Sequence, residues 1–190
     1  MKDHEKLYAA TREEWRRWLS ENHREKQGVW LVTYSKKSGK PTLTWSEAVD
    51  EALCFGWIDS IKKKLDEERA MQFFGKRKPT STWSKINKEK VSRLIEEGRM
   101  TPAGLACVEV AQQNGCWTIL DEVEALTIPE DLEAAFLLHD GAKNYFDSLS
   151  RSARKAILTW VVLAKRPDTR QKRVNEIAVL AAQNKKPKQF

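Results

Sequence analysis

The sequence predicts an α+β fold, in which a small antiparallel sheet with helices forms the N-terminal half and an all-helical C-terminal half follows. Two observations carry this prediction. Segments rich in β-branched and aromatic residues, typical of strands, occupy 28–34, 57–65 and 69–74. After Pro79 the apolar residues recur with the 3.6-residue period of helices, and glycine and proline mark the helix ends.

The same change of pattern predicts the domain organisation. We expect an α+β subdomain over 1–80 and a helical subdomain over 81–190, packed together as one unit. Within the strands, Ile58 and Phe73 are expected to face the interior.

Helix starts are predicted from capping residues. Thr11 and Glu14 have the spacing of a capping box, in which the threonine hydroxyl accepts the N–H of Glu14 and the carboxylate returns to the N–H of Thr11. Thr44 and Glu47 repeat this pattern. The remaining helices are expected to begin at polar caps or at prolines, or shortly after a proline. Their expected starts are Asn87, Thr101, Pro129, Ser150 and Arg170.

The charge of the chain is positive and uneven. The net charge is +7; residues 165–190 hold eight Lys/Arg and two acids, residues 62–90 hold ten and four, and residues 118–142 hold seven acids and no base. This segregation favours anionic partners at two places, although a charged run is also typical of a solvated face.

The cysteines and the apolar segments predict the compartment. Three cysteines form an odd set with no C-x-x-C pair, which favours free thiols over a disulfide framework or a zinc ribbon. No signal-peptide pattern opens the chain, and the longest apolar run, 156–164, is too short to span a bilayer. We therefore expect a soluble cytoplasmic protein with no metal, no cofactor and no membrane span.

Motifs of common enzymes do not occur. The chain has no G-x-S-x-G, H-E-x-x-H, Walker A or G-x-G-x-x-G pattern. The apolar neighbours of Cys54 favour a buried structural thiol, and no basic residue stands near Cys116 in sequence to activate it. The sequence therefore names no reaction.

The first candidate site combines two indoles, a carboxylate, cations and a hydroxyl around the last two predicted strands. Cations and free N–H groups beside a helix start favour an anion site. The alternative is structural, with an Asp59–Arg77 ion pair and hydroxyls that act only as caps. The candidate residues are Trp57, Asp59, Arg77, Ser81, Trp83 and Lys85.

The second candidate site is a basic corner around Pro167. Lys165 and Arg166 end one predicted helix, and Arg170 and Arg173 lie one turn apart at the start of the next. Such a corner can present several cations to a phosphate or to a nucleic-acid backbone. A solvated basic helix face is the alternative.

Five stretches carry a family resemblance: Ala52–Ser60 (ALCFGWIDS), Ser81–Asn87 (STWSKIN), Glu97–Gly104 (EGRMTPAG), Ala111–Trp117 (AQQNGCW) and Ala164–Arg170 (AKRPDTR). In these stretches the chain resembles the bacterial YdeI/OmpD-associated family, also labelled bacteriocin-protection proteins. The resemblance implies a bacterial cytoplasmic protein linked by name to antimicrobial-peptide or envelope stress. It implies no reaction, cofactor or catalytic residue.

Three functional hypotheses follow. The first is a non-catalytic protein that binds a small anionic ligand or a protein partner through the first candidate site, with the basic corner adjoining. The second is a small enzyme acting on an anionic substrate, with Asp59 as base and Arg77 as anion clamp. The third is weak nucleic-acid binding through the two basic segments.

Overall fold

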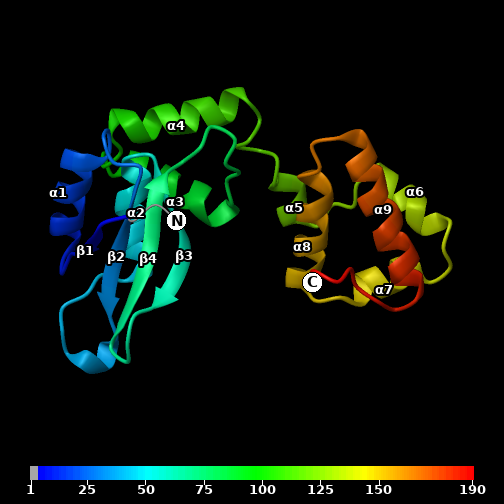
Figure 1. Ribbon diagram of the computed structural model, residues 1–190. Helices are drawn as coiled ribbons and strands as arrows, with labels where there is room; N and C mark the ends of the chain where they lie inside the picture. Colours follow the sequence, from blue (N-terminus) through cyan, green and yellow to red (C-terminus); the bar gives the residue numbers. More distant parts are fainter. Residues whose placement is uncertain (1–3) are drawn as a thin grey trace. The chain divides into compact units, whose positions relative to one another are not determined.

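A four-stranded sheet in the order β1-β2-β4-β3 forms the frame of the first part of the chain (Figure 1). The structure is a computed structural model and describes residues 4–190. The strands are β1 (Lys6–Tyr8), β2 (Gly28–Tyr34), β3 (Trp57–Lys64) and β4 (Arg69–Lys76). The α+β prediction is confirmed, as are its three strands.

The pairing of β1 differs from the expected antiparallel sheet. β2 and β3 both run antiparallel to β4, whereas β1 pairs parallel with β2, with Leu7 opposite Leu31, so the sheet is mixed. The sequence did not indicate β1, because three residues are too few to show a period.

The residues of β4 that point into the core differ by one position from the expected ones. Phe74 is fully buried opposite Val29, whereas Phe73 lies on the other face, where its ring contacts Trp30. Side chains alternate along a strand, so an offset of one residue exchanges the two faces. The expectation for Phe73 was therefore wrong, while Ile58 is half-buried and packs against the core.

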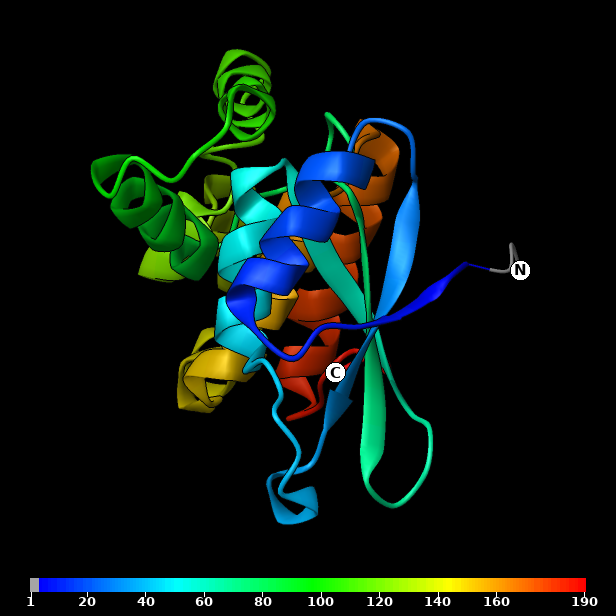
Figure 2. The ribbon, with the colours of Figure 1, turned by 90° about the vertical axis from the view of Figure 1, so that its left-hand side faces the viewer.

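Helices α1 (Arg12–Asn22) and α2 (Trp45–Cys54) lie side by side on one face of the sheet (Figure 2). A 3-10 turn, Lys36–Ser38, lies between β2 and α2. Trp15 of α1 is central to the packing, because its indole N–H donates to the carbonyl of Ala48 at 3.0 Å and its ring lies 5.4 Å from that of Phe74. A large aromatic side chain thus joins both helices to the sheet.

Helices α3 (Lys85–Glu96) and α4 (Pro102–Gln113) pack against α2 and complete the first core. Thr101 anchors the start of α4, because its hydroxyl donates to the carbonyl of Cys54 at 2.6 Å and its N–H donates to the same oxygen at 3.1 Å. Gly104 is required here, since a Cβ would collide with that carbonyl. The last turn of α2 therefore fixes the position of α4.

The caps agree with the sequence in most places. The capping box of Thr44 and Glu47 is complete, and Thr101 and Ser150 cap their helices. The carboxylate of Glu14 accepts the N–H of Ala10 rather than that of Thr11.

Two helices begin earlier than expected. Ser84 and not Asn87 caps α3, because its hydroxyl accepts the N–H of Asn87 itself. The last helix begins at Pro167 and not at Arg170, since proline suits the first helical position.

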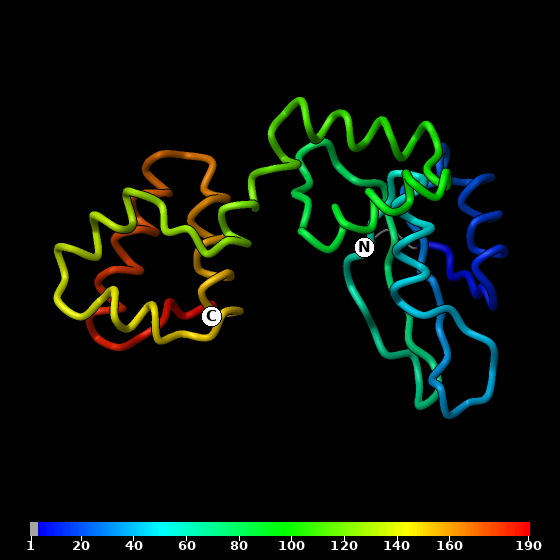
Figure 3. Tube along the Cα trace, turned by 180° about the vertical axis from the view of Figure 1, so that it is seen from behind, coloured from blue at the N-terminus to red at the C-terminus, as the bar shows by residue number. Residues whose placement is uncertain are grey.

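The helices after Trp117 form a second core of their own. They are α5 (Asp121–Ala125), α6 (Glu130–Leu137), α7 (Ala142–Ser148), α8 (Arg151–Val162) and α9 (Pro167–Ala182). Helix α9 packs against α6, α7 and α8, and the chain end returns to α8, where the Phe190 ring lies 5.9 Å from that of Trp160 (Figure 3). The expected helical C-terminal half is confirmed.

The chain divides into two compact units, Met1–Trp117 and Thr118–Phe190. This division falls later than the expected boundary at residue 80, because α3 and α4 share the core of the sheet although they follow its last strand. That the two parts pack as one unit stays a prediction. Within the described part of the chain, no helix combines the length and apolarity needed to cross a bilayer.

Candidate functional site

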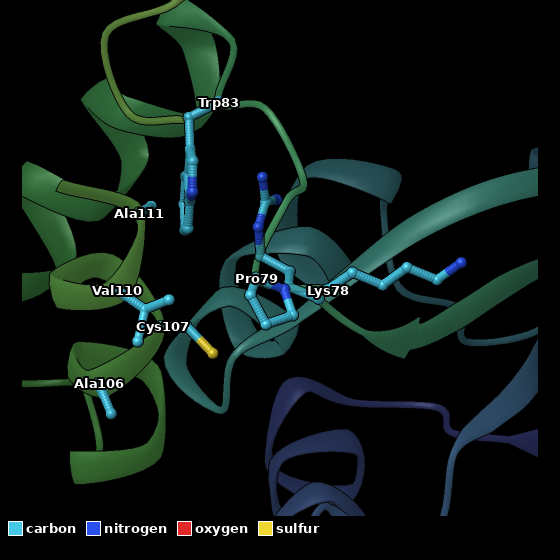
Figure 4. A pocket seen from close by; sticks show the side chains of 8 residues that line it. Lys78, Pro79, Trp83, Ala106, Cys107, Val110 and Ala111 are labelled. Carbon is cyan, nitrogen blue, oxygen red and sulfur yellow. The ribbon is translucent and has the colours of Figure 1, made fainter. Parts of the chain in front are cut away.

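A pocket of about 160 Å³ lies in the first unit, between α4 and the loop that follows β4. Its lining is mostly apolar but includes two basic residues and one thiol. In Figure 4, Cys107 and Val110 extend from α4 on one side of the pocket, and Pro79 lies on the other. The residues that line it are Arg77, Lys78, Pro79, Trp83, Ala106, Cys107, Val110 and Ala111.

The backbone carbonyl of Gly56 contacts two polar residues of this pocket, Arg77 and Cys107. Its carbonyl accepts the N–H of Arg77 at 2.9 Å, and the Cys107 thiol lies 3.8 Å from the same oxygen. Gly56 has a φ of +73°, and a Cβ there would lie 2.6 Å from the Cys107 sulfur. Glycine is therefore required both by the left-handed turn and by the close approach of α4.

Arg77 is the unusual residue of the pocket. It is only 9% exposed, and its guanidinium carbon lies 3.6 Å from the centroid of the Trp83 ring. Its Nη2 donates to the carbonyl of Thr82 at 2.6 Å, whereas Nε and Nη1 are buried and have no hydrogen-bond partner among the residues that the structure describes. Within residues 4–190, no carboxylate forms an ion pair with Arg77.

Burial lowers the pKa of Arg77 to about 10, and the nearby groups Cys107 and Asp59 only partly oppose this shift. The side chain nevertheless stays protonated at neutral pH. A buried cation with two unpartnered donors is costly unless an anion pairs with it. This combination in a pocket is typical of a binding site.

The two predicted indoles are both in the core. Trp83 is 2% exposed and forms the floor under Arg77, so it contributes to the pocket through its ring face. Trp57 is 1% exposed and contacts Trp18 edge-on, and its buried Nε1 has no hydrogen-bond partner within the described part of the chain. Trp57 therefore does not belong to an exposed recognition surface.

Asp59 lies apart from the lining of this pocket. Its Oδ2 accepts hydrogen bonds from the indole of Trp45 at 2.8 Å and the amide of Gln72 at 3.3 Å. The irregular pairing that begins after Asp59 in β3 accompanies this orientation. The Asp59–Arg77 ion pair that was one alternative does not form, and the structure does not bring a base at Asp59 and a clamp at Arg77 into one lining.

Ser81 and Lys85 have local roles. The Ser81 hydroxyl accepts the N–H of Lys78 at 3.2 Å, which closes the turn of the loop. Lys85 is exposed at the start of α3, and its ammonium lies 3.8 Å from the carboxylate of Glu89. Neither residue lines the pocket.

The basic corner belongs to the second unit and is partly used in folding. Arg170 forms two hydrogen bonds with Asp131, at 2.6 and 2.9 Å, and these lower the pKa of that carboxyl. Arg173 donates to the carbonyl of Trp160, and its guanidinium carbon lies 4.9 Å from the centroid of that indole ring. Lys165 and Arg166 remain exposed. Two of the four predicted cations are therefore engaged within the fold, and the other two are exposed where a polyanion could contact them.

A buried acidic pair on α2 was missed by the sequence interpretation. Glu51 is fully buried and accepts hydrogen bonds from Arg12, Arg16 and Arg99. Asp50, beside it, binds Lys90 at 2.5 Å and Arg93 at 2.6 Å. This cluster joins α1, α2, α3 and the turn before α4, and its charges are mutually paired, so we regard it as structural.

Cys107 and its α4 neighbours were also missed as site residues. The signal that could have found them is the pair of glycines at 56 and 104, which mark where α4 and the α2–β3 turn approach closely. All three cysteines are free, and Cys54 is buried as expected. Within residues 4–190, no group of three or more metal-ligating side chains is placed to hold a metal ion.

Comparison with known families gives two matches. Residues 7–107 match the model of a family described as Domain of unknown function (DUF8412), and the chain belongs to this family, since the match spans more than half of its length. Residues 125–184 match the model described as Bacteriocin-protection, YdeI or OmpD-Associated, which confirms the resemblance seen in the sequence. Searches of curated proteins and of solved structures returned no match.

Four of the five stretches that carried the resemblance lie within the two matches, and the stretch 111–117 lies between them. Three of them, 52–60, 81–87 and 97–104, lie within the first match, and 164–170 lies within the second. The pocket residues Arg77 to Cys107 thus fall in the first family, and the basic corner falls in the second.

Proposed function

We propose that the first unit binds a small organic anion in the pocket formed by Arg77, Trp83 and Cys107, without catalysing a reaction on it. The observation that carries the proposal is the buried guanidinium, whose Nε and Nη1 have no partner in the described chain. A carboxylate or similar oxyanion would accept from these donors and relieve the cost of the buried charge.

The rest of the pocket defines the body of the ligand. Ala106, Val110 and Pro79 offer apolar contacts around the cation. Its volume of about 160 Å³ is smaller than the roughly 300–1,000 Å³ of pockets for drug-sized ligands. A small carboxylate with a short apolar body therefore fits better than a nucleotide.

The catalytic alternative ranks lower. It requires Asp59 as base beside an anion held by Arg77, but Asp59 is outside this lining and its carboxylate is engaged by Trp45 and Gln72. Nucleic-acid binding also ranks lower, because Arg170 and Arg173 of the basic corner are engaged within the second unit.

We place this binding in the bacterial cytoplasm, in a protein linked to antimicrobial-peptide or envelope stress. The support for that setting is the match of residues 125–184 to the Bacteriocin-protection, YdeI or OmpD-Associated family. The odd set of free cysteines is consistent with a reducing compartment.

The test is a thermal-shift comparison of propionate with propionamide, its neutral isostere, at constant ionic strength and neutral pH. For a Kd of about 1 mM, ligand at about 10 mM stabilises by roughly 1.4 kcal/mol, which raises Tm by about 3–6 °C. We expect propionate to produce this shift and propionamide to produce none.

Variants separate the site from general charge effects. Arg77→Gln should abolish the propionate shift, whereas Arg17→Gln, the same change at an exposed arginine of α1, should retain it. A panel of small carboxylates that leaves Tm unchanged, or shifts both variants equally, would contradict the proposal.

A further inference from the structure

Cys107 has the one thiol that lines the Arg77 pocket. It is partly exposed and free, whereas Cys54 is fully buried and Cys116 is outside the lining. A thiol beside a cation with unpartnered donors combines a nucleophile with an anchor for negative charge.

We infer that Cys107 is the ligand-contacting thiol of this pocket and a modification site for small electrophiles that carry a carboxylate. This inference rests on the proposed anion site and names the class of ligand that it takes. The carboxylate would bind Arg77, and the electrophilic carbon would lie against the sulfur.

The shared anchor of the two side chains supports this pairing. The Gly56 carbonyl accepts the backbone N–H of Arg77 at 2.9 Å and lies 3.8 Å from the Cys107 sulfur. The backbone of Arg77 and the thiol of Cys107 thus share one anchor. The guanidinium is held in place by the Thr82 carbonyl and the Trp83 ring. A fixed nucleophile and a fixed anchor raise the effective concentration of a reagent that binds between them.

Burial and the charge of Arg77 have opposite effects on the pKa of the Cys107 thiol. Burial raises the pKa of Cys107, and the charge of Arg77 opposes that rise. The thiol is therefore mostly protonated at neutral pH, and its reaction should speed up as pH rises. Arg77 therefore affects both the thiolate fraction and the binding of a negatively charged reagent. The experiment has to measure the second effect independently of the first.

The reaction with the probe iodoacetate balances simply. The Cys107 thiol loses its proton to solvent, and the thiolate sulfur attacks the methylene carbon of iodoacetate. The C–I bond breaks, and iodide leaves with the bonding electrons. The product is a carboxymethyl thioether, whose carboxylate stays within reach of the guanidinium. No oxidant or further reactant is needed.

The experiment compares alkylation rates for iodoacetate and for neutral iodoacetamide at each cysteine. The same thiolate attacks both reagents, so the ratio of the two rates cancels the thiolate fraction. Cleavage after glutamate separates the sites, because Glu51 and Glu67 flank Cys54 and Glu109 lies between Cys107 and Cys116. Mass spectrometry of these peptides then gives each rate.

We expect the iodoacetate-to-iodoacetamide ratio to be about tenfold higher at Cys107 than at Cys116, the size of one charged hydrogen bond. Arg77→Gln should reduce the ratio at Cys107 to that of Cys116, and Arg77→Lys should restore part of it. Arg17→Gln is the matched control and should leave the ratio unchanged.

The failures of the two proposals are distinguishable. If propionate shifts Tm through Arg77 but the ratios at Cys107 and Cys116 are equal, the anion site stands and the role of Cys107 is overturned. The same holds if neither reagent alkylates Cys107 in the folded protein. If the propionate shift and the ratio are both absent, both proposals are overturned.

Discussion

The guanidinium carbon of Arg77 lies 3.6 Å from the centroid of the Trp83 ring, so a buried cation stacks on a buried indole. The face of the indole stabilises the charge by about 2 kcal/mol when both groups are desolvated. It cannot accept the N–H bonds at the edge of the guanidinium, and Nε and Nη1 remain unpartnered. The stack therefore orients the cation, and Nε and Nη1 are the donors that the proposed ligand would use.

The first prediction is that Arg77→Met stabilises the protein in the absence of ligand. The fall of the Arg77 pKa from its ordinary value to about 10 corresponds to a penalty of about 3 kcal/mol. Because a base with a lowered folded pKa is penalised while protonated, this cost is present at pH 7 and is relieved only above about pH 10. Loss of the stacking, about 2 kcal/mol, offsets most of the gain, so we expect a net rise of about 1 kcal/mol in the free energy of unfolding.

Urea unfolding at pH 7 measures this change. Tryptophan fluorescence reports mainly on the first unit, which contains seven of the eight tryptophans. Arg17→Met, at an exposed position, should stay within about 0.5 kcal/mol of the wild type. A loss of stability in Arg77→Met would indicate that the cation is already paired within the fold.

The second prediction concerns the buried carboxylate of Glu51. Glu51→Gln should lower the free energy of unfolding by about 3 kcal/mol, because Arg12, Arg16 and Arg99 all lose the charge that they surround. The control is Glu97→Gln, which removes a more exposed carboxylate from Arg93 and should cost less than about 1 kcal/mol. Equal losses in the same urea experiment would show that Glu51 does not hold the helices together.

The third prediction is a pH dependence that arises from Asp50. Burial acts to raise the pKa of Asp50, but hydrogen bonds and charge from Lys90 and Arg93 lower it below the ordinary 3.8. A carboxyl with a lowered folded pKa stabilises the fold above its unfolded pKa, and this contribution is lost as pH falls through the folded pKa. Stability of the first unit should therefore fall below about pH 4, and Asp50→Asn should be less stable at pH 7 and lose less on acidification. An unchanged pH slope in Asp50→Asn would exclude this cause.

The fourth prediction concerns polyanions. Only Lys165 and Arg166 of the basic corner are exposed, so duplex DNA should gain at most about two phosphate contacts there, with a slope of log K against log salt near −2 from this corner. Lys165→Gln with Arg166→Gln should remove that part of the slope in a fluorescence-anisotropy titration. Arg170→Ala serves as a test of folding, because it breaks the pair with Asp131. Sub-micromolar affinity at 150 mM salt would instead make nucleic acid the leading partner.

The sequence was informative where local rules decide the structure. The β-branched segment 28–34 and the caps at Thr44, Thr101 and Ser150 depend on neighbours in sequence, and they were predicted. Arg77, which was named from the sequence as part of a candidate anion site, does line a pocket, and its role as an anion ligand stays a prediction.

Features built from distant segments could not be predicted in this way. Arg16 donates to the carbonyl of Arg99, 83 residues away, and the Cys107 thiol lies beside Gly56, 51 residues away. The burial of Trp57 likewise depends on α1, which supplies Trp18. A single sequence shows which residue types are present but not which distant residues come into contact in the fold.

The most direct test of the anion site is the response of the Arg77 Nε–H group in ¹⁵N NMR. Arg77→Lys assigns the signal by its disappearance. We expect the chemical shift of this signal to change saturably with propionate and to stay constant with propionamide. Propionate is an anion that pairs with the guanidinium, whereas propionamide is neutral. A signal that stays in place with propionate and other small carboxylates would contradict the account.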